Sequence, residues 1–137
     1  MRILVIDDQR IFNSFPSLPE LGMGDMVVHC DTSQLGLQSL YDGDWDEVYL
    51  DHDMGMESDM SGTDMVDYIE SEQTFSDIFL EVGKFYIHTM NPTGGEYMMR
   101  VLKKLGYEVE RLDPTPYLDF DAMYNEGRNP WLAGPKR

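Results

Sequence analysis

The chain has 137 residues, a formal net charge of −16 and a hydrophobic fraction of 42%. This length and apolar content predict one folded domain rather than a disordered acidic segment. The negative charge argues against binding duplex nucleic acid and against a polybasic membrane contact, because both depend on clustered Lys and Arg. The single Cys30 excludes an internal disulfide and a cysteine-based zinc site.

The first residues favour a soluble, cytoplasmic protein. The opening apolar run, residues 3–6, is short and is followed at once by Asp7 and Asp8. Neither a signal peptide nor a membrane span has this pattern. We therefore expect no membrane association and a reducing compartment, which agrees with the use of a single cysteine.

The first quarter of the chain predicts two strands with an irregular stretch between them. Residues 2–8 contain a continuous apolar, β-branched run that ends in two acids, typical of a strand buried on both faces of a sheet. Residues 9–25 contain Pro and Gly at several positions and predict irregular structure. Residues 26–31 predict a second strand, and Thr32 or Ser33 can cap a helix that follows it through Tyr41.

The middle of the chain continues the alternation. A third strand is expected at residues 47–50, and a polar loop leads from it to a helix at residues 63–72. Residues 75–82 predict a further helical turn. Residues 84–87 (Lys-Phe-Tyr-Ile), with two aromatics and a β-branched residue, predict a fourth strand.

The last part of the predicted domain adds a helix at residues 96–105, which Gly106 stops, and an edge strand at residues 107–112. Strands that alternate with helices predict a doubly wound α/β fold with a parallel sheet. We expect one domain over residues 1–113. Residues 114–137, rich in Pro and aromatic side chains, are expected to form a C-terminal extension packed against this domain.

Three predicted strands end in polar clusters: Asp7-Asp8, Asp51-His52-Asp53 and His88-Thr89-Met90-Asn91. In an open parallel sheet, ligands bind beyond the carboxyl ends of the strands. Residues 1–70 also carry 16 acids against two arginines, and a solvated acidic face accounts for most of them. Carboxylates at the ends of buried strands instead need protons or a cation. The sequence therefore predicts a Mg²⁺ or Mn²⁺ site, with ligands from Asp7, Asp8, Asp51 and Asp53; alternatively, Asp8 only caps the residues after it.

Two histidines are candidates for proton transfer. His88 ends a buried strand beside the predicted metal site, and imidazole titrates near neutrality. His52 follows Asp51 and is a second candidate, although a single histidine at such a position is often structural or simply exposed. If a cyclic phosphate is opened here, one histidine would deprotonate water while the other protonates the leaving oxygen. We interpret His29, on the second strand, as structural.

A phosphate also needs donors for its oxygens. Thr93, Gly94 and Gly95 open the predicted helix near Asn91, where backbone N–H groups and the helix dipole can receive an anion. The alternative is an ordinary turn imposed by Pro92.

The strand-end residues are similar to those of response-regulator receiver domains: Asp7-Asp8 after the first strand, Asp51 after the third and Thr89 after the fourth. Two segments extend the likeness, LDHDMG at residues 50–55 and IHTMNPTGG at residues 87–95. Together they resemble the cyclic-phosphate-processing receiver domain family of phages and bacteria, over roughly residues 2–113. The resemblance implies a flavodoxin-like three-layer sandwich with strand order 2-1-3-4-5, an acidic metal pocket in which Asp51 is central, and cyclic-phosphate processing.

One departure bears on function. A signalling receiver carries a Lys at the end of its fifth strand, whereas residues 111–114 here read Arg-Leu-Asp-Pro. This argues against phosphorelay through Asp51. The leading hypothesis is a metal-dependent phosphoesterase acting on a cyclic nucleotide or an RNA end. The alternative is a non-catalytic acidic protein, of the kind phages produce, that docks on a basic host partner.

Overall fold

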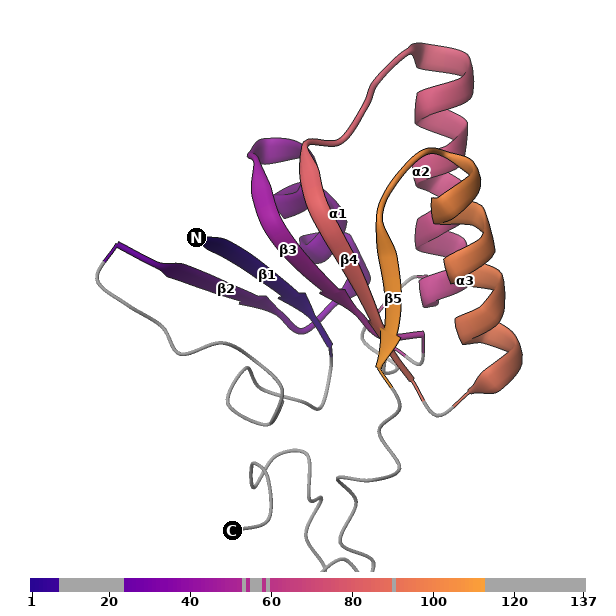
Figure 1. Ribbon diagram of the computed structural model, residues 1–137, viewed down its shortest axis with the longest axis horizontal. Coiled ribbons are helices and arrows are strands. Elements are labelled where there is room, and N and C mark those ends of the chain that lie inside the picture. Colours follow the sequence, from indigo (N-terminus) through magenta and orange to yellow (C-terminus); the bar gives the residue numbers. More distant parts are fainter. Residues whose placement is uncertain (8–23, 53, 55–57, 59, 90, 113–137) are drawn as a thin grey trace, which may run out of the picture.

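The computed structural model describes residues 1–7, 24–52, 54, 58, 60–89 and 91–112. Five parallel strands form one sheet in the order β2-β1-β3-β4-β5: β1 Arg2–Ile6, β2 Met26–Cys30, β3 Trp45–Leu50, β4 Val82–His88 and β5 Val109–Leu112. Three helices alternate with them: α1 Ser33–Asp42, α2 Gly62–Ser76 and α3 Pro92–Lys104 (Figure 1). The predicted receiver-like fold and its strand order are confirmed.

Side chains alternate between the two faces of the sheet. Leu4, Ile6, Leu50 and Ile87 are buried on one face, in a cluster to which all three helices contribute. From the helices come Leu37 and Leu40 of α1, Met65, Val66 and Ile69 of α2, and Met98, Val101 and Leu102 of α3. The hydrophobic core of the described residues therefore lies between this face of the sheet and its layer of helices.

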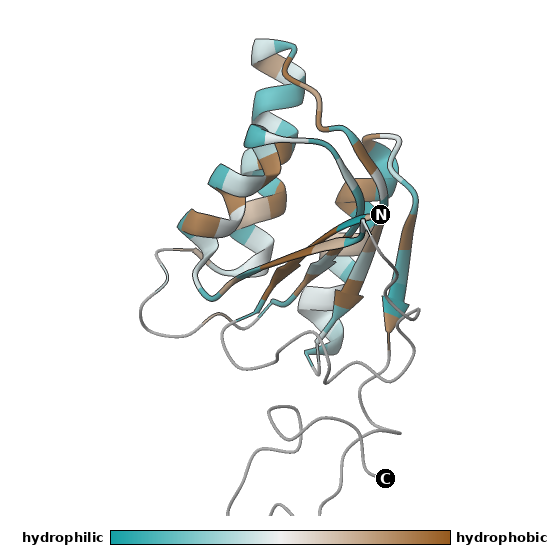
Figure 2. Ribbon diagram, turned by 90° about the vertical axis from the view of Figure 1, so that its left-hand side faces the viewer, coloured by the Kyte–Doolittle hydropathy of each residue, from teal (hydrophilic) through white to brown (hydrophobic). Residues whose placement is uncertain are grey.

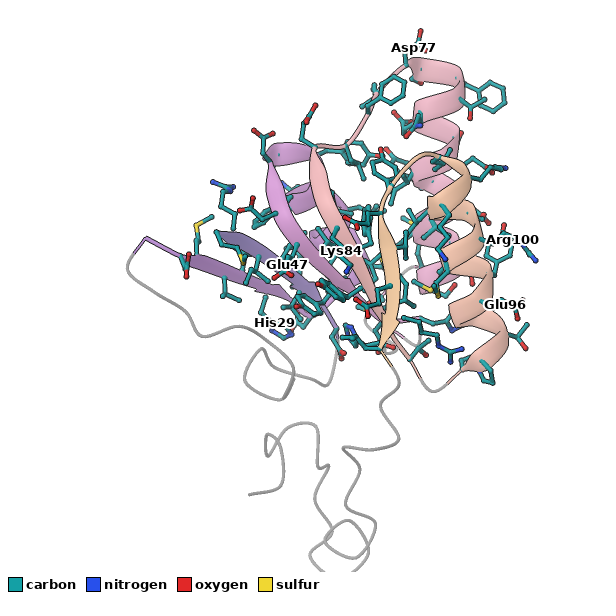
Figure 3. The ribbon with its side chains drawn as sticks, viewed as in Figure 1. His29, Glu47, Asp77, Lys84, Glu96 and Arg100 are labelled. Carbon is teal, nitrogen blue, oxygen red and sulfur yellow. The ribbon has the colours of Figure 1, made fainter. Side chains whose placement is uncertain are left out.

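The other face carries a smaller cluster of Ile3, Val5 and Tyr49, to which no described helix contributes. The ring of Tyr49 stacks on that of Tyr86, with centroids 4.7 Å apart. Lys84 lies over the Tyr86 ring and pairs with Glu110 at 2.9 Å, and Figure 3 shows Lys84 beside Glu47 on this side of the sheet. The second helical layer of the predicted sandwich falls outside the described residues, as do residues 8–23 and 113–137.

Helix boundaries follow from caps. The Thr32 hydroxyl accepts the Leu35 N–H, as predicted. Ser61 and Asp64 form a reciprocal capping box that starts α2. The predicted helical turn at residues 75–82 is wrong: α2 ends at Ser76, because Asp77 takes a left-handed conformation with φ 55°, and the chain then runs without a helix into β4.

The helix predicted at residues 96–105 corresponds to α3 and begins four residues earlier, at Pro92. Asn91 caps it by accepting the Gly94 N–H at 2.9 Å, and Pro92 occupies the first helical position, where its fixed φ is favourable. The Pro-Thr-Gly-Gly segment is thus the first turn of α3 rather than a loop. None of the described helices combines the length and apolar character needed to cross a lipid bilayer.

Candidate functional site

Asp7, Asp51 and His88 lie side by side at the carboxyl end of the sheet. Ile6 pairs with Leu50 and Leu50 with Ile87, so these three residues follow at the next position of adjacent strands. The Asp51 N–H donates to the Ile6 carbonyl at 3.1 Å and continues this register. All three side chains are at most 3% exposed.

A short hydrogen bond joins two of them. His88 Nε2 lies 2.6 Å from Asp7 Oδ2, and both side chains are buried. An ionised carboxylate can only accept, so the hydrogen on this bond belongs to Nε2. Asp7 therefore fixes the orientation and tautomer of His88, as a carboxylate does for a catalytic imidazole.

His29 reaches the same place from β2. Its Nε2 lies 2.9 Å from the Asp7 carbonyl oxygen, to which it donates (Figure 3 labels His29 on its strand). This contact ties the edge strand to the end of β1. It agrees with the structural interpretation of His29.

His52 lies over the beginning of α3. Its Nδ1 is 3.4 Å from Asn91 Nδ2, while Asn91 Oδ1 accepts the Gly94 N–H. The capping bond fixes which way the Asn91 amide points, so the amide donates to Nδ1 and a neutral His52 carries its proton on Nε2. A Cβ on Gly94 would come within 2.7 Å of Cγ and Nε2 of the ring. Glycine at this position therefore makes room for His52.

Arg111 is the residue that the sequence analysis missed. It lies on β5 opposite Ile87, and its guanidinium donates to the Thr89 carbonyl at 3.3 Å. A Cβ on Gly95 would be 3.1 Å from Arg111 Nε and 3.0 Å from Thr89 Cγ2. A cation thus stands beside Thr89 at the first turn of α3. The available signal was an Arg near the carboxyl end of the last strand, next to the strand that ends in His88 and Thr89.

Some backbone N–H groups in the first turn of α3 already donate hydrogen bonds within the protein. The Asn91 side chain accepts the Gly94 N–H, the Asn91 carbonyl accepts the Gly95 N–H, and Pro92 has no N–H to offer. The predicted anion binding by Thr93, Gly94 and Gly95 stays a prediction. Glycine is needed at positions 94 and 95 because a larger side chain would collide with His52 or Arg111.

The metal site also stays a prediction. Among the residues with described positions, no group of three or more His, Cys, Asp or Glu side chains is arranged to hold a metal ion. Asp7 and Asp51 are brought to adjacent strand ends, but the other two predicted ligands, Asp8 and Asp53, lie outside the described residues. The described residues thus supply two of the four carboxylates.

Ser58 and Met60, which follow β3 in the chain, hydrogen-bond to Ser33 at the start of α1. Ser33 is fully buried, and its hydroxyl accepts the Met60 N–H at 3.1 Å, while the Ser33 N–H donates to the Ser58 hydroxyl. Gly62 at the start of α2 donates to the His52 carbonyl at 2.8 Å. These bonds hold the described backbone between β3 and α2 against the edge that carries Asp51 and His52.

A comparison of the sequence with family models identifies the family of this chain. The model of the cyclic-phosphate processing receiver domain matches residues 2–104. The chain belongs to this family. The match includes every described residue of the candidate site except Arg111, which follows its end. A comparison with curated proteins found no match.

Proposed function

We propose that this cyclic-phosphate processing receiver domain binds a cyclic phosphodiester at the carboxyl end of its sheet and hydrolyses it to a phosphomonoester. The observation that carries the proposal is the family match over residues 2–104. The residues gathered at this end supply what the reaction needs: a cation, two imidazoles and buried carboxylates. The ligand is a cyclic nucleotide or an RNA end with a cyclic phosphate.

Arg111 is the proposed phosphate ligand on the protein. A guanidinium offers several N–H donors in a planar fork that matches two phosphate oxygens. Arg111 already donates to the Thr89 carbonyl, so a phosphate beside Thr89 lies within its reach. The arginine thus takes the role that the missing Lys would have had in neutralising the anion.

The two histidines have complementary proton states. In hydrolysis, the oxygen of water bonds to phosphorus, one ring P–O bond breaks, one proton leaves the water and another reaches the departing oxygen. His52 in its imidazolium form is the proposed donor: it gives one proton to the departing oxygen and returns to the neutral ring that contacts Asn91. Asp7 holds the proton of His88 on Nε2, which makes Nδ1 the basic nitrogen of that ring, and stabilises the charge that His88 gains as the proposed base.

The metal proposal keeps Mg²⁺ or Mn²⁺ with Asp7, Asp8, Asp51 and Asp53 as ligands. Carboxylate oxygens are the ligands these ions prefer. A bound divalent ion would supply positive charge to the phosphate next to that of Arg111. The proposed roles of Arg111, His52 and His88 do not depend on which ion is bound.

The test is turnover of cyclic nucleotides and of an RNA ending in a cyclic phosphate, followed by phosphorus NMR with Mg²⁺, with Mn²⁺ and with a chelator. We expect loss of turnover by about a hundredfold or more in His88→Ala, His52→Ala and Asp51→Ala, in line with the usual contribution of a positioned acid or base. Arg111→Ala should weaken substrate binding more than Arg111→Lys does. Glu108→Gln is the matched control. Glu108 is exposed and directly precedes β5, so this variant should retain full activity.

Retention of full activity by the purified site variants would contradict the proposal. So would labelling of Asp51 by a small phosphodonor in a protein that turns over no cyclic phosphate, which is the result expected of a phosphorelay receiver.

A further inference from the structure

A groove runs between α1 and α2, away from the residues of the candidate site. Its larger part has a volume of about 590 Å³ and is lined by Gln34, Leu37, Gln38, Tyr41, Asp42, Met60, Tyr68, Glu72 and Ile78. A smaller hollow of about 250 Å³ continues it past the end of α2, lined by Leu40, Tyr41, Asp42, Gly43, Asp44, Ile78, Phe79, Leu80 and Glu81. The two share Tyr41, Asp42 and Ile78, so we treat them as one surface, the α1–α2 groove.

The groove exposes large apolar side chains. Tyr68, Ile78 and Phe79 are 43%, 44% and 60% exposed. The connection from α2 to β4, which contains Ile78 and Phe79, stands out as a brown segment leaving the top of α2 in Figure 2. A contiguous patch of this kind on a soluble domain is typical of an interaction site.

The polar residues around this patch are mostly acids. Asp42, Asp44, Glu72 and Glu81 line the groove, and no Lys or Arg is among its lining residues. The described lysine salt bridges, Lys84–Glu110 and Lys104–Glu70, use other carboxylates. The guanidinium of Arg2 lies at the groove's margin, where it donates to the Asp44 carbonyl.

The shape and the charge of the groove together indicate which kind of ligand it binds. A groove between two helices suits an amphipathic helix, which places apolar side chains at helical spacing into it. The acidic lining favours Lys and Arg beside those apolar side chains, because complementary charge raises the rate and specificity of association. A second copy of this chain would bring the same acids against each other.

We propose that the α1–α2 groove binds a basic amphipathic helix of a partner protein. This inference is independent of the proposed phosphate chemistry, because it uses none of the residues at the carboxyl end of the sheet. It gives the acidic lining of this groove a partner chemistry: Leu- or Ile-like side chains flanked by Lys and Arg.

The test uses a fluorescent model helix of leucines and lysines, long enough to form a stable helix, in anisotropy titrations. Binding should weaken as salt rises. Phe79→Asp and Glu72→Lys should each weaken it by about tenfold, through loss of an apolar anchor and of charge complementarity. Glu96→Lys is the matched control: it makes the same change in net charge on α3, far from Asp77 at the end of α2 (Figure 3), and should leave affinity within about twofold of the original.

Several results would overturn the inference. One is equal weakening by Glu72→Lys and Glu96→Lys, which would mean attraction to the overall charge alone. Others are no binding at low salt, equal binding of a peptide with glutamines in place of lysines, or a dimer in sedimentation that Phe79→Asp dissociates. Ile78→Asp repeats the apolar test if Phe79→Asp lowers the melting temperature. Turnover of cyclic phosphates should be unchanged in all these groove variants.

Discussion

Replacing His88 with Phe is expected to lower the free energy of unfolding by about 3–5 kcal/mol. The change removes the imidazole that lies 2.6 Å from the Asp7 carboxylate in a place where both side chains are almost completely buried. A buried carboxylate that loses such a close hydrogen-bonded partner recovers much less of the cost of leaving water. Urea denaturation followed by circular dichroism measures the loss.

The matched variant removes both partners. In the double replacement of His88 with Phe and Asp7 with Leu, no carboxylate remains at this position, so most of the lost stability should return. Turnover should be absent in both variants, because both lack the proposed base. If the single variant is as stable as the unchanged protein, or if the double variant is less stable than the single one, then the Asp7–His88 pair does not have the energetic role inferred here.

Gly62→Ala is expected to lower the free energy of unfolding by about 1–3 kcal/mol. A Cβ at this position would lie 2.6 Å from the Asp51 carbonyl oxygen and 2.7 Å from His52 Cα. Both are backbone atoms at the end of β3, so the start of α2 or the strand end has to move. The displacement also shifts Asp51 and His52 and should reduce cyclic-phosphate turnover.

Gly94→Ala provides the contrast. There the added Cβ meets the ring of His52, which can rotate away without moving the backbone. We therefore expect a much smaller loss of stability than in Gly62→Ala, together with a clear loss of turnover. Thermal unfolding of the two variants side by side tests this order. If Gly94→Ala loses more stability than Gly62→Ala, the prediction is contradicted, and the clash of the Cβ added at Gly62 with the backbone of Asp51 and His52 is not the larger cost.

Most of the fold is readable from the sequence because parallel strands buried on both faces leave continuous apolar runs. The run at residues 3–6 is an example, and all four of these side chains are completely buried. The convergence of Asp7, Asp51 and His88 could also be anticipated, since strand ends of one parallel sheet share an edge. The position of each strand in the sheet came instead from the family resemblance.

Other features depend on contacts between distant segments, which local patterns do not carry. Glycines in Pro-Thr-Gly-Gly look like a loop, but Gly94 and Gly95 are small because His52 and Arg111 pack against them. The end of α2 at Ser76 depends on one left-handed residue, Asp77, where no glycine marks the stop. Arg111 was recognised only as a missing Lys, because its closeness to Thr89 exists only once β5 lies beside β4.

The most direct test of the central claim is amide NMR of the labelled protein during titration with a nucleoside cyclic phosphate, with and without Mg²⁺. The account predicts saturable shifts at Asp51, His52, Thr89, Asn91 and Arg111, and no comparable shifts along the α1–α2 groove. It also predicts that Arg111→Ala raises the ligand concentration needed for half-saturation by about tenfold, as expected for the loss of one charged phosphate contact. Shifts confined to other surfaces, or unchanged affinity in Arg111→Ala, would contradict binding at the carboxyl end of the sheet.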